Sequence, residues 1–112
     1  MEPSKFVVYL DRTLPEDFLI AITGAKEGKR QRKIWGLDEY ETEFDKVEVR
    51  IDPKYSLMSM SFIEGMFSKS VAKLGRQGFV EKYDFICDQH IKDSISSELM
   101  FMDDEYFTYE KR

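Results

Sequence analysis

The sequence predicts an α/β domain, with α+β as the alternative, in which helices pack on a small mixed sheet. Residues 46–51 alternate like a half-buried strand, residues 61–74 hold a helical apolar stripe, and residues 79–87 form a second apolar strand. A strand, a helix and a further strand in this order favour a right-handed β-α-β unit with a parallel strand pair. We therefore expect a parallel β-α-β-α core over residues 46–102.

The N-terminal elements each have a local signal. Residues 6–10 are β-branched or aromatic and predict the first strand. Thr13 and Glu16 have the spacing of a capping box, and Pro15 between them suits a first helical turn because it has no N–H to lose. We therefore expect a helix from Thr13 to Gly24, where a left-handed residue is easiest.

Residues 25–45 form a charged insertion or hairpin in this interpretation. The segment is basic at first and acidic from residue 38 onward. Residues 33–35 predict a short edge strand, with Gly28 in the preceding turn. Leu37, Tyr40 and Phe44 recur at spacings of three and four, which predicts a short helix.

The C-terminal half carries the clearest boundaries. Asp52-Pro53 ends the strand before it, because proline cannot donate to a β-ladder. Ser61 and Glu64 form a second capping box, which predicts a helix from Ser61 to a stop at Gly75. Its apolar residues share one half of the helical wheel: Phe62, Ile63, Met66, Phe67, Val71 and Leu74.

The last strand and helix follow the same logic. In residues 79–87, Tyr83, Phe85 and Cys87 share one face of the expected strand. Asp88 is placed to cap a final helix. The apolar stripe of this helix is Ile91, Ile95, Leu99 and Met102.

Composition bounds the function. The chain has 112 residues, enough for one domain, and its 17 Lys and Arg against 22 Asp and Glu give a net charge of −5. This charge argues against a general nucleic-acid binder. A single Cys and a single His exclude an internal disulfide and argue against a standard metal site, and no cofactor fingerprint is present. The start has no apolar run typical of a signal peptide, and no run reaches the length of a membrane span, so we expect a cytoplasmic protein.

A family resemblance appears in the order of short motifs. Residues 47–52 form a strand that ends in aspartate, and residues 61–64 then open a helix with Ser-Phe and an acidic residue. Leu74-Gly75, an aromatic residue, the strand around residues 83–86 and the Asp88-Gln89 turn follow. Over residues 46–100 this order resembles the STAS-like domain family.

The resemblance implies a non-enzymatic regulatory module that binds another protein. It is similar to relatives of the anti-sigma factor antagonists, whose partners change when a serine near the start of this helix is phosphorylated. The partner-binding residues expected here are Tyr55, Met58, Ser59, Met60, Ser61, Glu64 and Ser68. Ser59 and Ser61 are the candidates for phosphorylation, since a helix N-terminus favours a phosphate; simple capping is the alternative reading of Ser61.

Three other features keep two readings each. Cys87 and His90 are either a reactive pair or a buried thiol followed by a turn histidine. Residues 26–33 with Trp35 either bind phosphate or single-stranded nucleic acid, or form a solvated surface that the next carboxylates neutralise within one molecule or across a homodimer. The acidic aromatic stretches 38–45 and 103–110 are either plain surface or a protein interface.

A second function comes from a different class. An acidic inhibitor, such as a phage-encoded anti-defence protein, would block a nucleic-acid-binding enzyme by filling its basic groove. The short length, the excess of carboxylates and the lack of a catalytic set fit this alternative.

Overall fold

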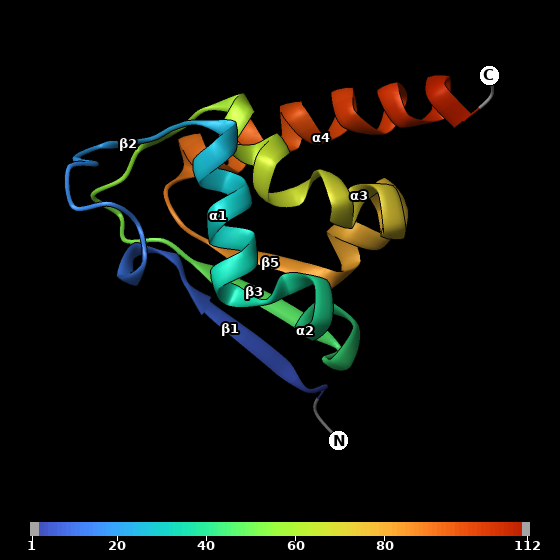
Figure 1. Ribbon diagram of the computed structural model, residues 1–112, viewed down its shortest axis with the longest axis horizontal. Coiled ribbons are helices and arrows are strands. Elements are labelled where there is room, and N and C mark those ends of the chain that lie inside the picture. Colours follow the sequence, from blue (N-terminus) through green and yellow to red (C-terminus); the bar gives the residue numbers. More distant parts are fainter. Residues whose placement is uncertain (1–2, 111–112) are drawn as a thin grey trace.

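Three parallel strands form the sheet at the base of the molecule (Figure 1). The computed structural model describes residues 3–110, and the side chains of residues 3–102. β1 (Lys5–Tyr9), β3 (Lys46–Arg50) and β5 (Tyr83–Ile86) lie in the order β1-β3-β5. The predicted α/β class and the predicted parallel pairing of the two C-terminal strands are confirmed. Every described strand pair is parallel, so the expected mixture of strand directions does not occur in this part of the chain.

A second, two-stranded pair lies apart from this sheet. β2 (Ala21–Ile22) pairs in parallel with β4 (Leu57–Met58), and we call this pair the ribbon. The predicted helix over residues 13–24 is therefore wrong. The backbone of this segment pairs with a distant segment instead of forming a helix, because the carbonyl of Ile20 accepts hydrogen bonds from the amides of Ser56 and Leu57.

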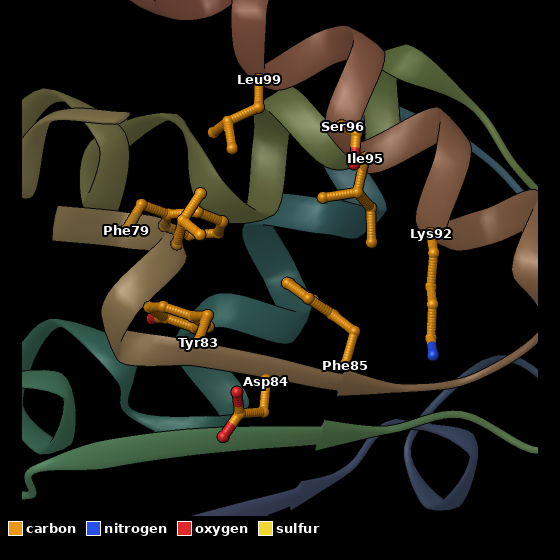
Figure 2. A pocket seen from close by; sticks show the side chains of 9 residues that line it. Phe79, Tyr83, Asp84, Phe85, Lys92, Ile95, Ser96 and Leu99 are labelled. Carbon is orange, nitrogen blue, oxygen red and sulfur yellow. The ribbon is translucent and has the colours of Figure 1, made fainter. Parts of the chain in front are cut away.

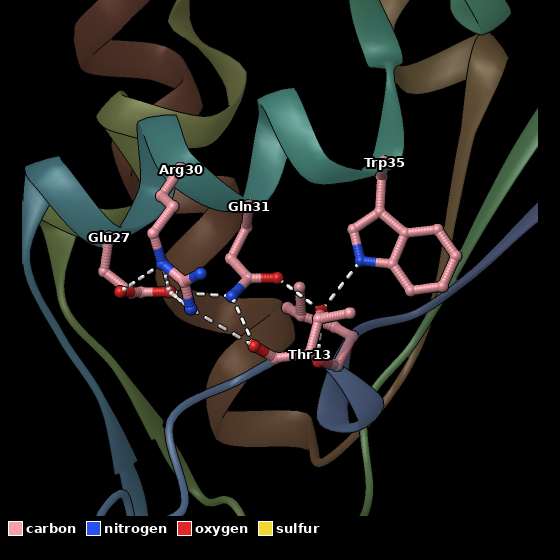
Figure 3. Close-up of polar contacts among 6 residues, drawn as sticks. Thr13, Glu27, Arg30, Gln31 and Trp35 are labelled. Atoms are coloured by element: carbon pink, nitrogen blue, oxygen red, sulfur yellow. Dashed lines mark hydrogen bonds and ion pairs between the residues drawn. The ribbon is translucent and has the colours of Figure 1, made fainter.

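Thr13, the expected cap of that helix, bonds to a different helix. A short 3₁₀ helix, η1 (Leu10–Arg12), precedes Thr13, whose hydroxyl donates to the carbonyl of Leu10. The same hydroxyl contacts the side-chain oxygen of Gln31 and accepts a 2.9 Å hydrogen bond from the Trp35 indole. The Gln31 amide nitrogen also donates to the Thr13 carbonyl at 2.9 Å (Figure 3). Long-range contacts thus replace the local cap.

Two helices replace the expected charged hairpin. α1 (Ala25–Trp35) contains the whole basic stretch, so the predicted edge strand at residues 33–35 is wrong, and α2 (Leu37–Glu43) confirms the predicted short acidic helix. Gly36 joins them in the left-handed region, at φ 64°. Gly28 does not form a turn, because it lies in α1 where that helix crosses α3 (Met60–Lys82).

Two glycines allow α1 and α3 to touch backbone to backbone. A Cβ atom on Gly28 would lie 2.8 Å from the amide nitrogen of Met66, and closer still to the carbonyl oxygen of Phe62. A Cβ atom on Gly65 would lie 2.9 Å from the carbonyl carbon of Ala25. Real Cβ atoms essentially never come within 3.0 Å of such atoms. The crossing therefore requires glycine, a residue without a side chain, at both positions.

α3 begins and ends differently from its prediction. Ser59, not Ser61, is the N-cap, since its hydroxyl accepts the Phe62 amide at 3.1 Å. The chain kinks at Gly75, the predicted stop, with φ 77° and ψ 166°, and then continues as helix to Lys82. The first residues of the expected strand 79–87 are helical for this reason.

The final helix, α4 (Gln89–Glu110), agrees with its prediction at the N-terminus. The Asp88 carboxylate accepts the backbone N–H of His90 at 2.8 Å. All four residues of the predicted stripe are buried. The acidic aromatic residues predicted for an interface at 103–110 have side chains outside the described residues.

Helices cover one face of the sheet and build one core there (Figure 1). Phe6 packs on Tyr40 of α2, and Tyr83 and Phe85 pack on Phe67 of α3. On the opposite face, charged side chains pair along the strands. There the Glu48 carboxylate accepts hydrogen bonds from Lys5 at 3.1 Å and from Arg50 at 2.6 Å.

Candidate interaction surface

Large apolar side chains are exposed at the end of the molecule that carries the ribbon. Leu19 is 74% exposed, Ile20 58%, Leu57 53% and Met60 57%. We call these four residues the ribbon patch. The Ile20 carbonyl accepts hydrogen bonds from the Ser56 and Leu57 amides at 3.0 and 3.2 Å, so segments far apart in sequence meet here. Single exposed apolar residues are ordinary, but several on segments that are hydrogen-bonded to one another indicate a contact surface.

Strand pairing explains why these side chains face solvent. Paired residues of the ribbon share a side, and Ile22 and Met58, which are paired, are 0% and 4% exposed. Their neighbours Ala21 and Leu57, also paired, alternate to the outer side. The ribbon therefore holds one apolar layer in the core and presents another outside.

Ser59 fixes the ribbon to α3. Its backbone N–H donates to the Ile22 carbonyl at 2.9 Å, and its hydroxyl accepts the Gly24 amide at 3.2 Å as well as capping α3. The hydroxyls of Ser59 and Ser61 lie 3.1 Å apart. Ser59 is thus half-buried and engaged by backbone donors, while Ser61 is exposed.

The predicted partner-binding residues differ in their exposure to solvent. Met60 and Ser61 are exposed, and Ser59, Glu64 and Ser68 are half-buried. Tyr55 and Met58 are only 3% and 4% exposed, and belong to the core. This burial corrects their expected place on the surface, because both side chains fill space under the ribbon and leave almost no area for a partner.

Leu19, Ile20 and Leu57 were not among the residues predicted from the sequence. Leu19 and Ile20 fall within the predicted helix over residues 13–24, which does not form. The feature that could have identified them is the run of consecutive apolar residues after Pro15, which lacks a clear helical periodicity. Leu57 lies between the predicted strand end at Asp52-Pro53 and the predicted helix start at Ser61, and no pattern distinguishes it there.

A buried polar cluster joins α1, α2, α3 and β5 under the helices. The Arg32 guanidinium donates to the Met66 carbonyl at 2.9 Å and to the Ser70 hydroxyl at 2.7 Å. The Glu41 carboxylate accepts the Tyr83 hydroxyl at 2.5 Å and the Ser70 hydroxyl. Burial and the nearby Glu41 carboxylate raise the pKa of Tyr83 far above its ordinary value. The cluster therefore holds a neutral tyrosine and binds the elements together.

A cavity of about 260 Å³ opens beside β5, between the end of α3 and α4 (Figure 2). Phe79, Tyr83, Phe85, Ile95 and Leu99 form its walls, while polar groups at its margin include Asp84 and Lys92. The Tyr83 hydroxyl is already engaged by Glu41. Aromatic and aliphatic surface dominates this cavity, so it suits an apolar group better than acid–base chemistry.

The carboxyl ends of the three parallel strands border another cavity, of about 380 Å³. Asp11, Asp52 and Asp88 line it together with Cys87. Burial raises the pKa of the Cys87 thiol, which works against a nucleophilic thiolate. His90 hydrogen-bonds to Asp88 at 3.1 Å, and its backbone N–H helps to lower the Asp88 pKa. Among residues 3–102 no group of three or more His, Cys, Asp or Glu side chains is arranged to hold a metal ion.

No helix in the described part of the chain is both long and apolar enough to cross a bilayer. Comparison of the chain with protein-family models, with curated proteins and with solved structures gave no match.

Proposed function

We propose that this protein is a non-enzymatic regulatory module that binds another protein through the ribbon patch. The observation that carries the proposal is the exposure of four large apolar side chains at one end of the fold. Burying such side chains in an interface contributes roughly 25 cal/mol per Å² of apolar surface removed from water. Methionine suits this role because its flexible, polarisable side chain adapts to the shape of a partner.

Two further observations support this choice. Two residues of the patch, Leu57 and Met60, come from the connection between β4 and α3. This connection lies within the segment that resembles the STAS-like domain family. Ser61 is exposed next to Met60, at the start of α3, where a phosphate would meet free backbone N–H groups and the positive end of the helix dipole. Modification of Ser61 would therefore change the charge of the contact surface beside the cap at Ser59, whose hydroxyl lies 3.1 Å from that of Ser61.

The test compares two matched methionines. Met60 and Met100 are 57% and 59% exposed, but Met100 lies on α4 and outside the ribbon patch. The tagged wild-type chain, Met60→Ser and Met100→Ser are each purified from the native cell, and co-purifying proteins are identified by mass spectrometry. A protein that is retained by wild type and Met100→Ser is then produced, and its Kd is measured by calorimetry.

We expect Met60→Ser to weaken binding of that protein at least tenfold, and Met100→Ser less than twofold. Both variants should keep the wild-type circular dichroism spectrum, because both side chains are exposed. If the two variants weaken binding equally, or if binding collapses with salt and is competed by DNA or RNA, the proposal is overturned. The salt-dependent outcome would favour the acidic inhibitor instead.

A further inference from the structure

A basic cavity lies between α1 and α3. Its volume is about 410 Å³. The charged and polar residues around it are Lys29, Arg32 and Lys33 of α1, Asp38 of α2, and Ser68 and Lys69 of α3. The helix crossing at the two glycines brings these side chains together, since Lys29 and Lys33 are one turn apart on α1, and Gly65 and Lys69 are one turn apart on α3.

The charge of this cavity is opposite to that of the chain. Four cationic side chains and one carboxylate give a local balance of +3, whereas the whole chain carries −5. Cations gathered at one place repel each other unless an anion joins them. A local basic site in an acidic protein is thus a specific feature of this crossing.

Arg32 provides the fixed part of the site. Its side chain is 7% exposed, and its Nε donates to the Asp38 carboxylate at 2.8 Å. Nη1 donates to the Met66 carbonyl and to Ser70. Among the described residues Nη2 donates no hydrogen bond, so the guanidinium is held rigidly by three bonds and keeps the N–H groups of one nitrogen for a ligand. Rigid donors bind at a lower entropic cost than free ones.

We propose that this cavity binds the phosphate group of a small phosphorylated molecule. A planar guanidinium and flexible ammonium groups are the usual ligands of phosphate in proteins. The cavity has room for a compact ligand, and the Ser68 hydroxyl at its wall adds a further donor. The negative charge of the rest of the chain repels an extended polyanion, which favours a small ligand over nucleic acid. This inference does not depend on the ribbon patch.

The test uses calorimetric titration of the full chain with three probes: inorganic phosphate, inorganic pyrophosphate and adenosine diphosphate. Lys33→Gln and Lys69→Gln remove one cation each from exposed positions, so neither disturbs the core. Lys26→Gln is the matched control, because Lys26 is exposed on the same helix as Lys33 but does not border the cavity.

We expect saturable binding of pyrophosphate that weakens as salt is added. Lys33→Gln and Lys69→Gln should each weaken it at least fivefold, and Lys26→Gln less than twofold. Equal affinity for pyrophosphate and adenosine diphosphate would show that the phosphates alone are recognised, and tighter binding of adenosine diphosphate would show that the organic part contributes. Absence of saturable binding to all three probes, equal losses in all three variants, or tighter binding of a long single-stranded RNA through the same lysines would overturn the proposal.

Discussion

The helix crossing at Gly65 gives the sharpest test of the fold. Replacing Gly65 by alanine adds one methyl group where α3 meets the backbone of α1. That methyl carbon would lie 2.9 Å from the carbonyl carbon of Ala25 and 3.0 Å from its Cα, and closer still to the carbonyl oxygen. All three are backbone atoms, which cannot rotate away as the end of a side chain can. The two helices must therefore separate.

The magnitude follows from two opposing effects. Overpacking of a tight contact costs about 1–3 kcal/mol, and a clash with backbone belongs at the upper end. Alanine in place of glycine within a helix returns about 1 kcal/mol. We expect Gly65→Ala to lower the free energy of unfolding by about 2 kcal/mol, which for a chain of this size lowers Tm by roughly 8–10 °C.

The assay is urea unfolding followed by circular dichroism, with Gly78→Ala as the control. Gly78 is also in α3, but a Cβ atom there would meet the Cβ of Leu74 at 3.2 Å and no backbone. The gain in helix propensity roughly balances that single contact, so the control should stay within about 1 kcal/mol of wild type. A Gly65→Ala variant as stable as the wild-type chain would refute the close crossing of α1 and α3.

Three further predictions test other parts of the structure. Ser59→Ala should lower the free energy of unfolding by about 1 kcal/mol and Ser61→Ala by less than half as much, because only Ser59 caps α3; urea unfolding measures both, and the reverse order would contradict the cap. A hydrogen bond from Arg50 holds the pKa of the Glu48 carboxyl below its ordinary value. The ionised carboxylate therefore stabilises the fold at pH values above the ordinary pKa, and this contribution is lost as the pH falls through the lower pKa of the folded state. The stability gap between wild type and Glu48→Gln should therefore close between about pH 6 and pH 3, and a gap that does not change with pH would disprove the pairing. Tyr83→Phe should lower the free energy of unfolding by about 1–3 kcal/mol, because the Glu41 carboxylate loses a buried donor. If chemical denaturation detects no such loss, the buried cluster does not stabilise the fold.

Periodicity predicted the elements whose buried residues are apolar. Val47 and Val49 alternate with charged residues and lie at 0% exposure, so β3 was predictable. The four apolar residues of the α4 stripe behave in the same way. α1 has no such signal, because Gly28, Gln31 and Arg32 are its buried residues. A helix that buries a glycine and polar residues has no apolar stripe, so the pattern of hydrophobic residues makes it resemble a solvated segment.

The candidate surface was predictable only in part, for a related reason. The corner before α3 was identified from its motif, and Met60 and Ser61 do lie exposed there. The pattern could not show that Tyr55 turns inward, or that Leu19 comes from a distant segment to the same place, because both depend on the pairing of β2 with β4. A two-residue strand pair leaves too short a pattern to recognise.

The cluster around Arg32 and Glu41 has a consequence for any attempt to divide the protein. The motif-bearing stretch from residue 46 onward would, on its own, expose the slot that α1 occupies and leave Ser70 and Tyr83 facing water where a guanidinium and a carboxylate now stand. A polypeptide cut after residue 45 should therefore regain its native form only when both pieces are mixed, so the first 45 residues are an integral part of the architecture.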